Sequence, residues 1–115
     1  MLVMAWAIFH FSSTNEESQY FDNGQVKRTG DMVNSMNEGL WTWYYPNGAI
    51  QIQGSFHQGN REGEWFRYDS LGHKISISQY ENNRINGKYI EYDIAGEIVE
   101  EHIYQNDTLI KKVEY

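Results

Sequence analysis

The chain contains no cysteine, and this absence excludes several kinds of site. Without thiols there is no disulfide framework, no thiolate zinc site, no iron–sulfur cluster and no cysteine nucleophile. A chain without cysteine folds equally well in reducing and oxidising surroundings, so cysteine usage leaves the compartment open. Proline is nearly absent as well, because Pro46 is the single one, and no collagen-like or low-complexity pattern is present.

Positive charge is also scarce. The 115 residues include 9 Lys and Arg against 16 Asp and Glu, which gives a formal net charge of -7. Nucleic-acid backbones and anionic membrane surfaces require clustered Lys and Arg. The composition therefore argues against nucleic acid and membrane lipid as partners, whereas a basic protein would be attracted. The length fits one domain of ordinary size.

The amino-terminal residues 1–11 (MLVMAWAIFHF) form an apolar run that is too short to span a bilayer. The run lacks the Lys or Arg of a signal-peptide n-region, although Ala5-Trp6-Ala7 is similar to a small-x-small cleavage site. Three interpretations remain open: the remnant of an export signal, a first strand or cap, and a disordered tail. Residues 12–18 are polar and are interpreted as a linker.

Glycine is plentiful, and it is periodic with a spacing of 24 residues. Aromatic residues follow the same spacing. The glycine columns are Gly24, Gly48, Gly72 and Gly96; Gly39, Gly63 and Gly87; and Gly30 and Gly54. The aromatic columns are Tyr20, Tyr44, Tyr68 and Tyr92; Trp41, Trp65 and Tyr89; and the mixed series Met32, Phe56, Tyr80 and Tyr104. Such a period indicates a repeat architecture.

The periodicity divides the chain into an amino-terminal part, residues 1–18, and a repeat domain, residues 19–115. The repeat domain contains one partial unit, three full units and a short tail. Their ranges are 19–38 for the partial unit, 39–62, 63–86 and 87–110 for the full units, and 111–115 for the tail.

Each full unit is predicted to form a β-hairpin. Aromatic and β-branched runs of strand length lie at 41–45, 65–68 and 89–92, and returning strands follow at 49–53, 74–78 and 97–101. A tight turn that needs a positive φ explains the phased glycines, and all seven glycines of the first two columns are predicted to be structural turn glycines. Polar segments 58–62 and 81–86 are predicted as the turns between units.

No stretch has apolar residues at helical spacing for long enough to form a helix. Successive hairpins with short links form an antiparallel meander. The sequence therefore predicts an all-β protein, with one elongated, twisted single sheet that grows by stacking units. In one detail the repeat is irregular. When the units are aligned, Ile50 and Ile52 fall at positions whose side chains point to one face of the strand, whereas Ile75 and Ile77 fall at the alternate positions. A bulge in one unit would explain the change.

The pattern Gly39-x-Trp41-x-x-Tyr44, followed by Asn47-Gly48 and by Gly54-x-Phe56, resembles a MORN repeat. The spacing is similar to the bacterial variant of the YwqK family, whose members are often described as antitoxins. The resemblance covers about residues 19–110 and implies a non-enzymatic scaffold of repeated hairpins that makes protein contacts. Some MORN proteins are associated with phosphoinositide membranes, but this acidic chain offers no basic face for such a role. The sequence leaves the location unknown, with two options: the bacterial cytoplasm or, if residues 1–11 are a signal remnant, export.

The third and fourth hairpin turns depart from the Asn-Gly pattern. They carry Leu71-Gly72 and Ala95-Gly96 where the earlier units have an asparagine before the glycine. Because asparagine and glycine select particular turn types, the two later turns are expected to differ in type from the earlier ones.

No catalytic, metal or cofactor site is predicted. The histidines His10, His57, His73 and His102 have no metal-ligand spacing and occupy different columns of the repeat. No nucleophile elbow and no glycine-rich phosphate loop is present. The carboxylate clusters are interpreted as solvated charge, because a single-layer meander offers no obvious cleft for paired acids. The protein is therefore expected not to be an enzyme.

The aromatic columns are the candidate binding residues. Strict alternation predicts Trp41, Trp65 and Tyr89 on one face of the sheet and Tyr44, Tyr68 and Tyr92 on the other, with neighbours of one column stacked along the sheet. The columns either form the core or anchor a partner, since Trp and Tyr are typical hot-spot residues.

The leading hypothesis is a non-catalytic protein-binding module, with an antitoxin-like role toward a basic partner. The alternative is an exported structural or surface protein that self-associates through its open sheet edges.

Overall fold

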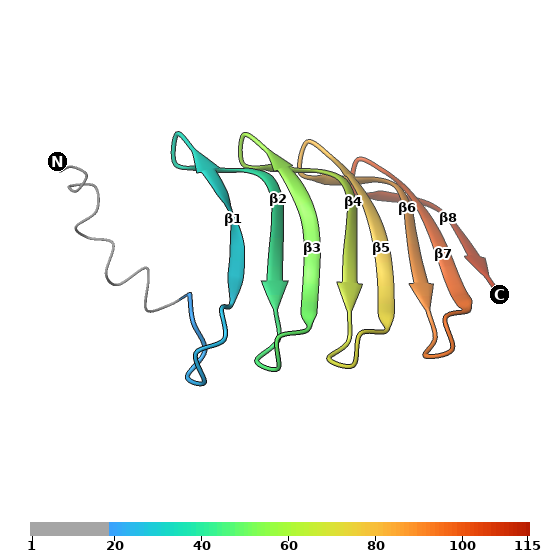
Figure 1. Cartoon of the computed structure of the whole chain (residues 1–115). Helices are drawn as coiled ribbons and strands as arrows, with labels where there is room; N and C mark the ends of the chain where they lie inside the picture. Colours follow the sequence, from blue (N-terminus) through green and yellow to red (C-terminus); the bar gives the residue numbers. More distant parts are fainter. Residues whose placement is uncertain (1–18) are drawn as a thin grey trace, which may run out of the picture.

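The computed structural model describes residues 19–115, so the predictions for residues 1–18 lie outside the described part. Eight strands form one sheet in the order β1 to β8, and every neighbouring pair is antiparallel (Figure 1). The strands are β1 (Arg28–Val33), β2 (Met36–Tyr44), β3 (Ile50–His57), β4 (Asn60–Tyr68), β5 (Lys74–Glu81), β6 (Arg84–Tyr92), β7 (Ile98–Gln105) and β8 (Thr108–Glu114). The predicted all-β meander in a single sheet is confirmed.

The sheet is long, bent and one layer thick. Its principal extents are 57 × 32 × 16 Å, and β1 and β8 lie at opposite ends of the row of strands (Figure 1). No second layer covers either face among residues 19–115. Only Trp41 and Trp65 are buried among the large hydrophobic side chains of these residues, each 8% exposed. The core is therefore a line of rings on one face of the sheet.

Four hairpin turns lie at the lower edge of the sheet in Figure 1, and they share one backbone geometry. They end at Gly24, Gly48, Gly72 and Gly96. In each, a glycine N–H donates to the carbonyl three residues earlier, as from Gly48 to Tyr45 at 2.9 Å and from Gly72 to Asp69 at 3.0 Å. All four turn glycines have φ between 88° and 95°, as Gly48 at 92° and Gly72 at 95° do. The expectation that the later turns differ in type is wrong. What changes is the side chain that supports the turn.

In the first two turns an asparagine supports the backbone. Asn47 accepts a hydrogen bond from the Ala49 N–H at 3.0 Å and donates to the Ser70 carbonyl of the next turn at 2.9 Å. In the third turn Asp69 accepts from the N–H groups of Leu71 and His73, each at 2.9 Å. Aspartate at the first turn position thus replaces asparagine at the third, and the backbone is unchanged.

The turns at the opposite, upper edge of the sheet in Figure 1, such as those between β3 and β4 and between β5 and β6, are shorter than predicted. The segments 58–62 and 81–86 were predicted as turns, but only two residues form each one, and β4 begins at Asn60 and β6 at Arg84. Both turn residues have positive φ, as Asn82 at 50° and Asn83 at 68° do. This is the type I′ geometry that matches the strand twist. The polar side chains beyond each turn belong to strands whose faces are open to water.

Two glycine columns have different structural roles. Gly24, Gly48, Gly72 and Gly96 lie in turns as predicted, but Gly39, Gly63 and Gly87 lie inside β2, β4 and β6, so their assignment to turns is wrong. These three glycines have φ of 75°, 75° and 111° at points where the strand register shifts. Positive φ at a bulge is the physical requirement that glycine meets there.

A second kind of bulge occurs in every full unit, next to the lower turn. The register shifts between Trp43 and Tyr44, and again at the equivalent places in β4 and β6. As a result Ile50 pairs with Tyr44 on one face and Ile52 pairs with Trp43 on the other. A bulge confined to one unit is therefore the wrong explanation for the isoleucine parity. All units share the bulge, and the isoleucines occupy different positions around it.

Candidate binding face

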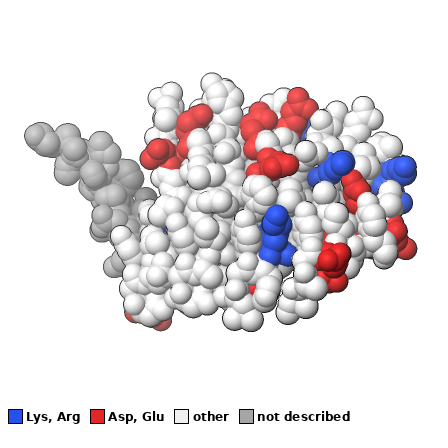
Figure 2. Space-filling view, turned by 45° about the vertical axis from the view of Figure 1, so that its right-hand side comes forward, with Lys and Arg blue, Asp and Glu red and all other residues white. Residues whose placement is uncertain are grey.

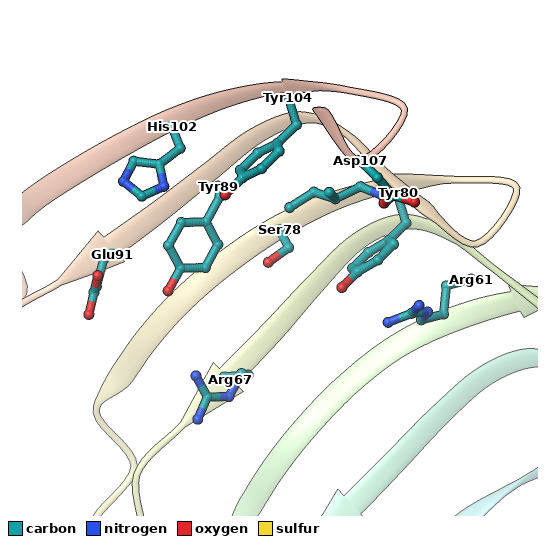
Figure 3. Close-up of a pocket in the computed structure, with 10 residues that line it drawn as sticks. Arg61, Arg67, Ser78, Tyr80, Tyr89, Glu91, His102, Tyr104 and Asp107 are labelled. Atoms are coloured by element: carbon teal, nitrogen blue, oxygen red, sulfur yellow. Dashed lines mark hydrogen bonds between the residues drawn. The ribbon is translucent and has the colours of Figure 1, made fainter. Parts of the chain in front are cut away.

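The strands bend around one face of the sheet, here called the concave face. It carries Trp41 and Trp43 of β2, Ile52 and Phe56 of β3, Arg61, Trp65 and Arg67 of β4, Ser76, Ser78 and Tyr80 of β5, Ile85, Tyr89 and Glu91 of β6, and Glu100, His102 and Tyr104 of β7. The opposite face is the convex face. In Figure 3 the labelled side chains project toward the inner side of the bend.

Aromatic rings form a continuous line along the concave face. Ring centroids are 5.9 Å apart for Trp41 and Trp43, and 5.8 Å apart for Trp43 and Trp65. Phe56 meets Trp65 edge to face at 5.0 Å, and Trp65 meets Tyr80 at 6.0 Å. Edge-to-face pairs contribute about 0.5 to 1.5 kcal/mol beyond the area they bury. These rings hold together strands that lack a second layer to pack against.

The sequence-predicted ladders lie on the faces expected from alternation. Trp41, Trp65 and Tyr89 occupy the concave face, and Tyr44, Tyr68 and Tyr92 the convex face. The prediction that rings of one column stack directly is wrong for Trp41 and Trp65. Residues of one column are two strands apart, and Trp43 and Phe56 lie between these two rings.

Each buried tryptophan lies over a glycine of the preceding strand. A Cβ added to Gly30 would lie 2.1 Å from the Trp41 ring, and a Cβ added to Gly54 would lie 2.1 Å from the Trp65 ring. The indole N–H groups donate to backbone carbonyls, Trp41 to Asp31 at 2.9 Å and Trp65 to Ser55 at 3.2 Å. The third glycine column therefore exists because an indole ring rests on the strand there.

The next unit breaks this glycine–tryptophan pairing. Ser78 stands where Gly30 and Gly54 stand in the earlier units, and Tyr89 stands where the tryptophans stand. The Cβ of Ser78 occupies the space that an indole would need. A hollow of about 570 Å³ opens at this place (Figure 3). We call it the arginine hollow; it is lined by Arg61, Arg67, Tyr80, Tyr89, Glu91 and His102, together with Ser78, Ile85, Tyr104 and Asp107.

Two arginines on β4 face the arginine hollow. The Arg61 guanidinium lies over the Tyr80 ring, with Cζ 4.3 Å from the centroid. Its Nε donates to Asn83 Oδ1 at 2.7 Å and its Nη2 to the Asn83 carbonyl at 3.3 Å, which fixes the plane of the group. Arg67 is exposed and makes no hydrogen bond or ion pair with the described residues 19–115. One cation is thus held in place, and the other is available.

The far wall of the arginine hollow is aromatic. The His102 ring lies 5.5 Å from Tyr89 and 6.1 Å from Tyr104. Its Nε2 pairs with Glu100 Oε1 at 3.1 Å, whereas its buried Nδ1 has no partner among residues 19–115. Burial, and then the Glu91 carboxylate, raises the pKa of Tyr89, so its phenol stays a hydrogen-bond donor through neutral pH.

A second, apolar hollow adjoins the first. It has a volume of about 280 Å³ and is lined by Trp43, Ile52, Phe56, Arg61 and Trp65. Arg61 belongs to both hollows. A further hollow, of about 420 Å³, lies between Arg28 and Trp41 at the β1 end of the face.

The charge of the concave face differs from that of the whole chain. Over β1 to β6 its hollows are lined by Arg28, Arg61 and Arg67 but by one strand carboxylate, Glu91. Arg28, Arg61 and Arg67 therefore lie on this face together with Glu91, and Asp107 lines the arginine hollow as well. Net charge gives no information on this local distribution of charge. On the view in Figure 2, acidic side chains gather along the upper part of the molecule.

Several acidic side chains are structural. Glu38 accepts a hydrogen bond from the Gln58 N–H of the next upper turn at 2.8 Å, and Glu62 accepts one from Asn82 at 3.4 Å. In the following unit Asn86 accepts one from Asn106 at 3.1 Å. The Gln58 N–H, together with His57, holds the pKa of Glu38 below its usual value. This column links each unit to the next, a role that the sequence pattern alone did not indicate.

Most of the residues that line the hollows were not predicted as site residues. The mixed column containing Phe56, Tyr80 and Tyr104 was visible as a periodic series, and all three lie on the concave face. The repeat pattern did not single out Arg61 and Arg67, because the equivalent positions in the other units hold other residue types. Residues 19–115 contain no group of three or more His, Asp or Glu side chains that could hold a metal ion. No helix within that range is long and apolar enough to cross a membrane.

Comparison with protein families gives three matches to one model, the MORN repeat variant, over residues 14–34, 37–58 and 61–82. Comparison with curated proteins finds no significant match. MORN repeats are generally associated with protein or membrane binding. The family matches cover more than half of the chain, and the repeated hairpins have the glycine and aromatic columns described above, so the chain belongs to the MORN repeat variant family.

Proposed function

We propose that the protein is a non-catalytic binding module that holds an extended segment of another protein on its concave face. The observation that carries this proposal is the line of aromatic rings on a face that no second layer covers among residues 19–115. Rings such as Phe56 remain partly exposed beside the apolar hollow. Aromatic and arginine side chains are the residue types that dominate binding energy at protein interfaces.

Site-specific photo-crosslinking in the native organism tests this proposal. A photoreactive amino acid replaces Met32, which is 58% exposed beside Trp41 and Trp43 on the concave face, or, as a matched control, Leu40, which is 59% exposed on the convex face. Both positions are on strand surfaces, so neither replacement disturbs the ring line. We expect one protein to be captured from position 32 and not from position 40. Capture from position 40 alone, or equal capture from both, would contradict the proposal.

An antitoxin-like role toward a basic partner is the second candidate. It is supported by the net charge of -7 and by exposed carboxylates outside the concave hollows, such as Glu64 and Glu81. Acidic surfaces accelerate association with basic proteins, and salt weakens that effect. If the captured protein is basic and toxic when expressed alone, co-expression of this chain restores growth under this hypothesis. Unchanged toxicity would refute it.

A further inference from the structure

We propose that the arginine hollow binds a carboxylate side chain of the partner segment while a neighbouring apolar side chain of that segment occupies the apolar hollow. The inference rests on the proposed function and specifies its ligand: an extended acidic–apolar peptide. It runs opposite to the net charge of the chain, which by itself would favour a basic partner.

Two guanidinium groups supply the attraction. Asn83 and the Tyr80 ring hold Arg61, and its Nη1 has no partner among the described residues. Arg67 lines the same hollow and is free of ion pairs with residues 19–115. A carboxylate that accepts hydrogen bonds from guanidinium groups forms the short, charge-assisted bonds that are strongest in proteins. Because Arg61 is already oriented, little conformational entropy is lost when a ligand binds.

An unsatisfied buried group at the same place indicates that the hollow is incomplete without a ligand or water. His102 lines the hollow, and its buried Nδ1 has no partner in the described part of the chain. Ser76, which is 1% exposed, lies beside the hollow with Arg67 and Glu91 as its strand neighbours in register. Native proteins satisfy nearly all such groups.

The carboxylates in the hollow favour a singly charged ligand group over a phosphate. Glu91 and Asp107 both line the hollow. A dianionic phosphate would meet two cations and two anions there, whereas a single carboxylate leaves Glu91 able to accept a backbone N–H of the bound segment. Charge complementarity therefore points to an Asp or Glu side chain.

The shared wall determines what lies beside the carboxylate. Arg61 lines both hollows, and Trp65 and Phe56 line the apolar hollow with it. In an extended peptide, alternate side chains point to the same side. An acidic residue and an apolar residue two positions apart can therefore enter the two hollows together.

A random peptide library displayed against the full chain tests the inference. We expect the selected peptides to be enriched in Asp or Glu two positions from an aromatic or aliphatic residue. Three variants are compared: Arg67→Gln, the pair Ser78→Gly with Tyr89→Trp, and the matched control Arg84→Gln, which removes the same charge outside the arginine hollow. The Ser78→Gly/Tyr89→Trp pair copies the glycine–tryptophan arrangement of the earlier units and so fills the hollow without removing a cation.

We expect Arg67→Gln to weaken binding of a selected peptide about tenfold, the usual effect of losing one charge-assisted hydrogen bond. Replacing the acidic residue of that peptide by its amide has the same effect on the wild type and little effect on Arg67→Gln. The filled-hollow pair abolishes the acidic preference, and Arg84→Gln changes nothing. Circular dichroism and thermal unfolding confirm that each variant is folded.

Three outcomes would overturn the inference. Selected peptides without an acidic preference, or with a basic one, refute it while leaving the proposed function intact. Failure to select any peptide refutes the proposed function as well. The third outcome is that no acidic peptide is selected and the chain binds phosphatidylcholine vesicles that contain a phosphoinositide. If Arg67→Gln abolishes this vesicle binding, the hollow binds a lipid headgroup instead.

Discussion

Replacing Gly54 by alanine is expected to destabilise the protein, although the backbone there would tolerate any residue. Gly54 is buried within β3 and does not have a positive φ. On backbone grounds alone, alanine would stabilise by about 0.4 to 1 kcal/mol, because it restricts the unfolded chain. The contact with Trp65 reverses the sign. The new Cβ would lie 2.1 Å from Cδ2 of the ring, where ordinary contact begins at 3.4 Å.

The size of the destabilisation follows from the contacts and the hydrogen bond that the Trp65 ring loses. Moving the Trp65 ring outward loosens its contacts with Trp43 and Phe56 and stretches the indole N–H bond to Ser55. Overpacking of this kind costs about 1 to 3 kcal/mol, and a lost hydrogen bond adds about 1 kcal/mol. After the alanine gain is subtracted, we expect a net loss of about 1 to 3.5 kcal/mol. For a domain of this size, the melting temperature falls by on the order of 10 °C.

Thermal and urea unfolding followed by tryptophan fluorescence measure the effect. Ser78→Ala is the matched control, because Ser78 occupies the same column and already has a Cβ, so its change is expected to stay within about 0.5 kcal/mol. The pair Gly54→Ala with Trp65→Tyr imitates the Ser78–Tyr89 arrangement and should recover part of the loss. If Gly54→Ala is as stable as the wild type, the ring does not rest on the strand and the reasoning is wrong.

Three further predictions concern the links between units. Glu38→Gln should destabilise the protein at neutral pH. Hydrogen bonds from the Gln58 N–H and His57 lower the folded-state pKa of Glu38, so the wild type loses the stability that the ionised carboxylate contributes as pH falls through that lowered pKa. Urea unfolding at several pH values should therefore show the stabilities of the two proteins converging in acid. Asn47→Ala removes two hydrogen bonds of about 1 kcal/mol each, whereas Leu71→Ala, at the equivalent position and 78% exposed, should be nearly neutral in thermal unfolding. Gly63→Ala places a side chain at φ 75° and should cost about 1 kcal/mol in urea unfolding; an unchanged midpoint would contradict the strain argument.

The architecture was predictable because it depends on residues that recur. Hairpin turns need glycine at fixed intervals, and strand alternation assigns aromatic columns to faces, so the meander and the two faces followed from the pattern. The pairing register of the strands was harder to predict from the sequence. The column of Gly39 and that of Gly48 have the same spacing, although one lies in a bulge and the other in a turn. Both need positive φ, and the sequence pattern records only that shared need.

The candidate site was largely not predictable, for a related reason. Tertiary contacts such as the Trp65 ring over Gly54 join residues of different columns, and no single column reveals them. The hollow arises where two columns change together, from Gly and Trp to Ser78 and Tyr89. A coupled change of this kind becomes interpretable only when the structure shows that the two residues compete for one space.

Changes within columns also explain how a uniform sheet acquires a directional surface. Trp43, Arg67 and Glu91 occupy one column on successive units, and Ile52, Ser76 and Glu100 occupy another. The hairpin geometry is the same in each unit, whereas the side chains change from apolar to cationic to acidic in the first column and from apolar to neutral polar to acidic in the second. A segment bound along the concave face would meet these chemistries in a fixed order, and that order would determine both which segment binds and which way it runs.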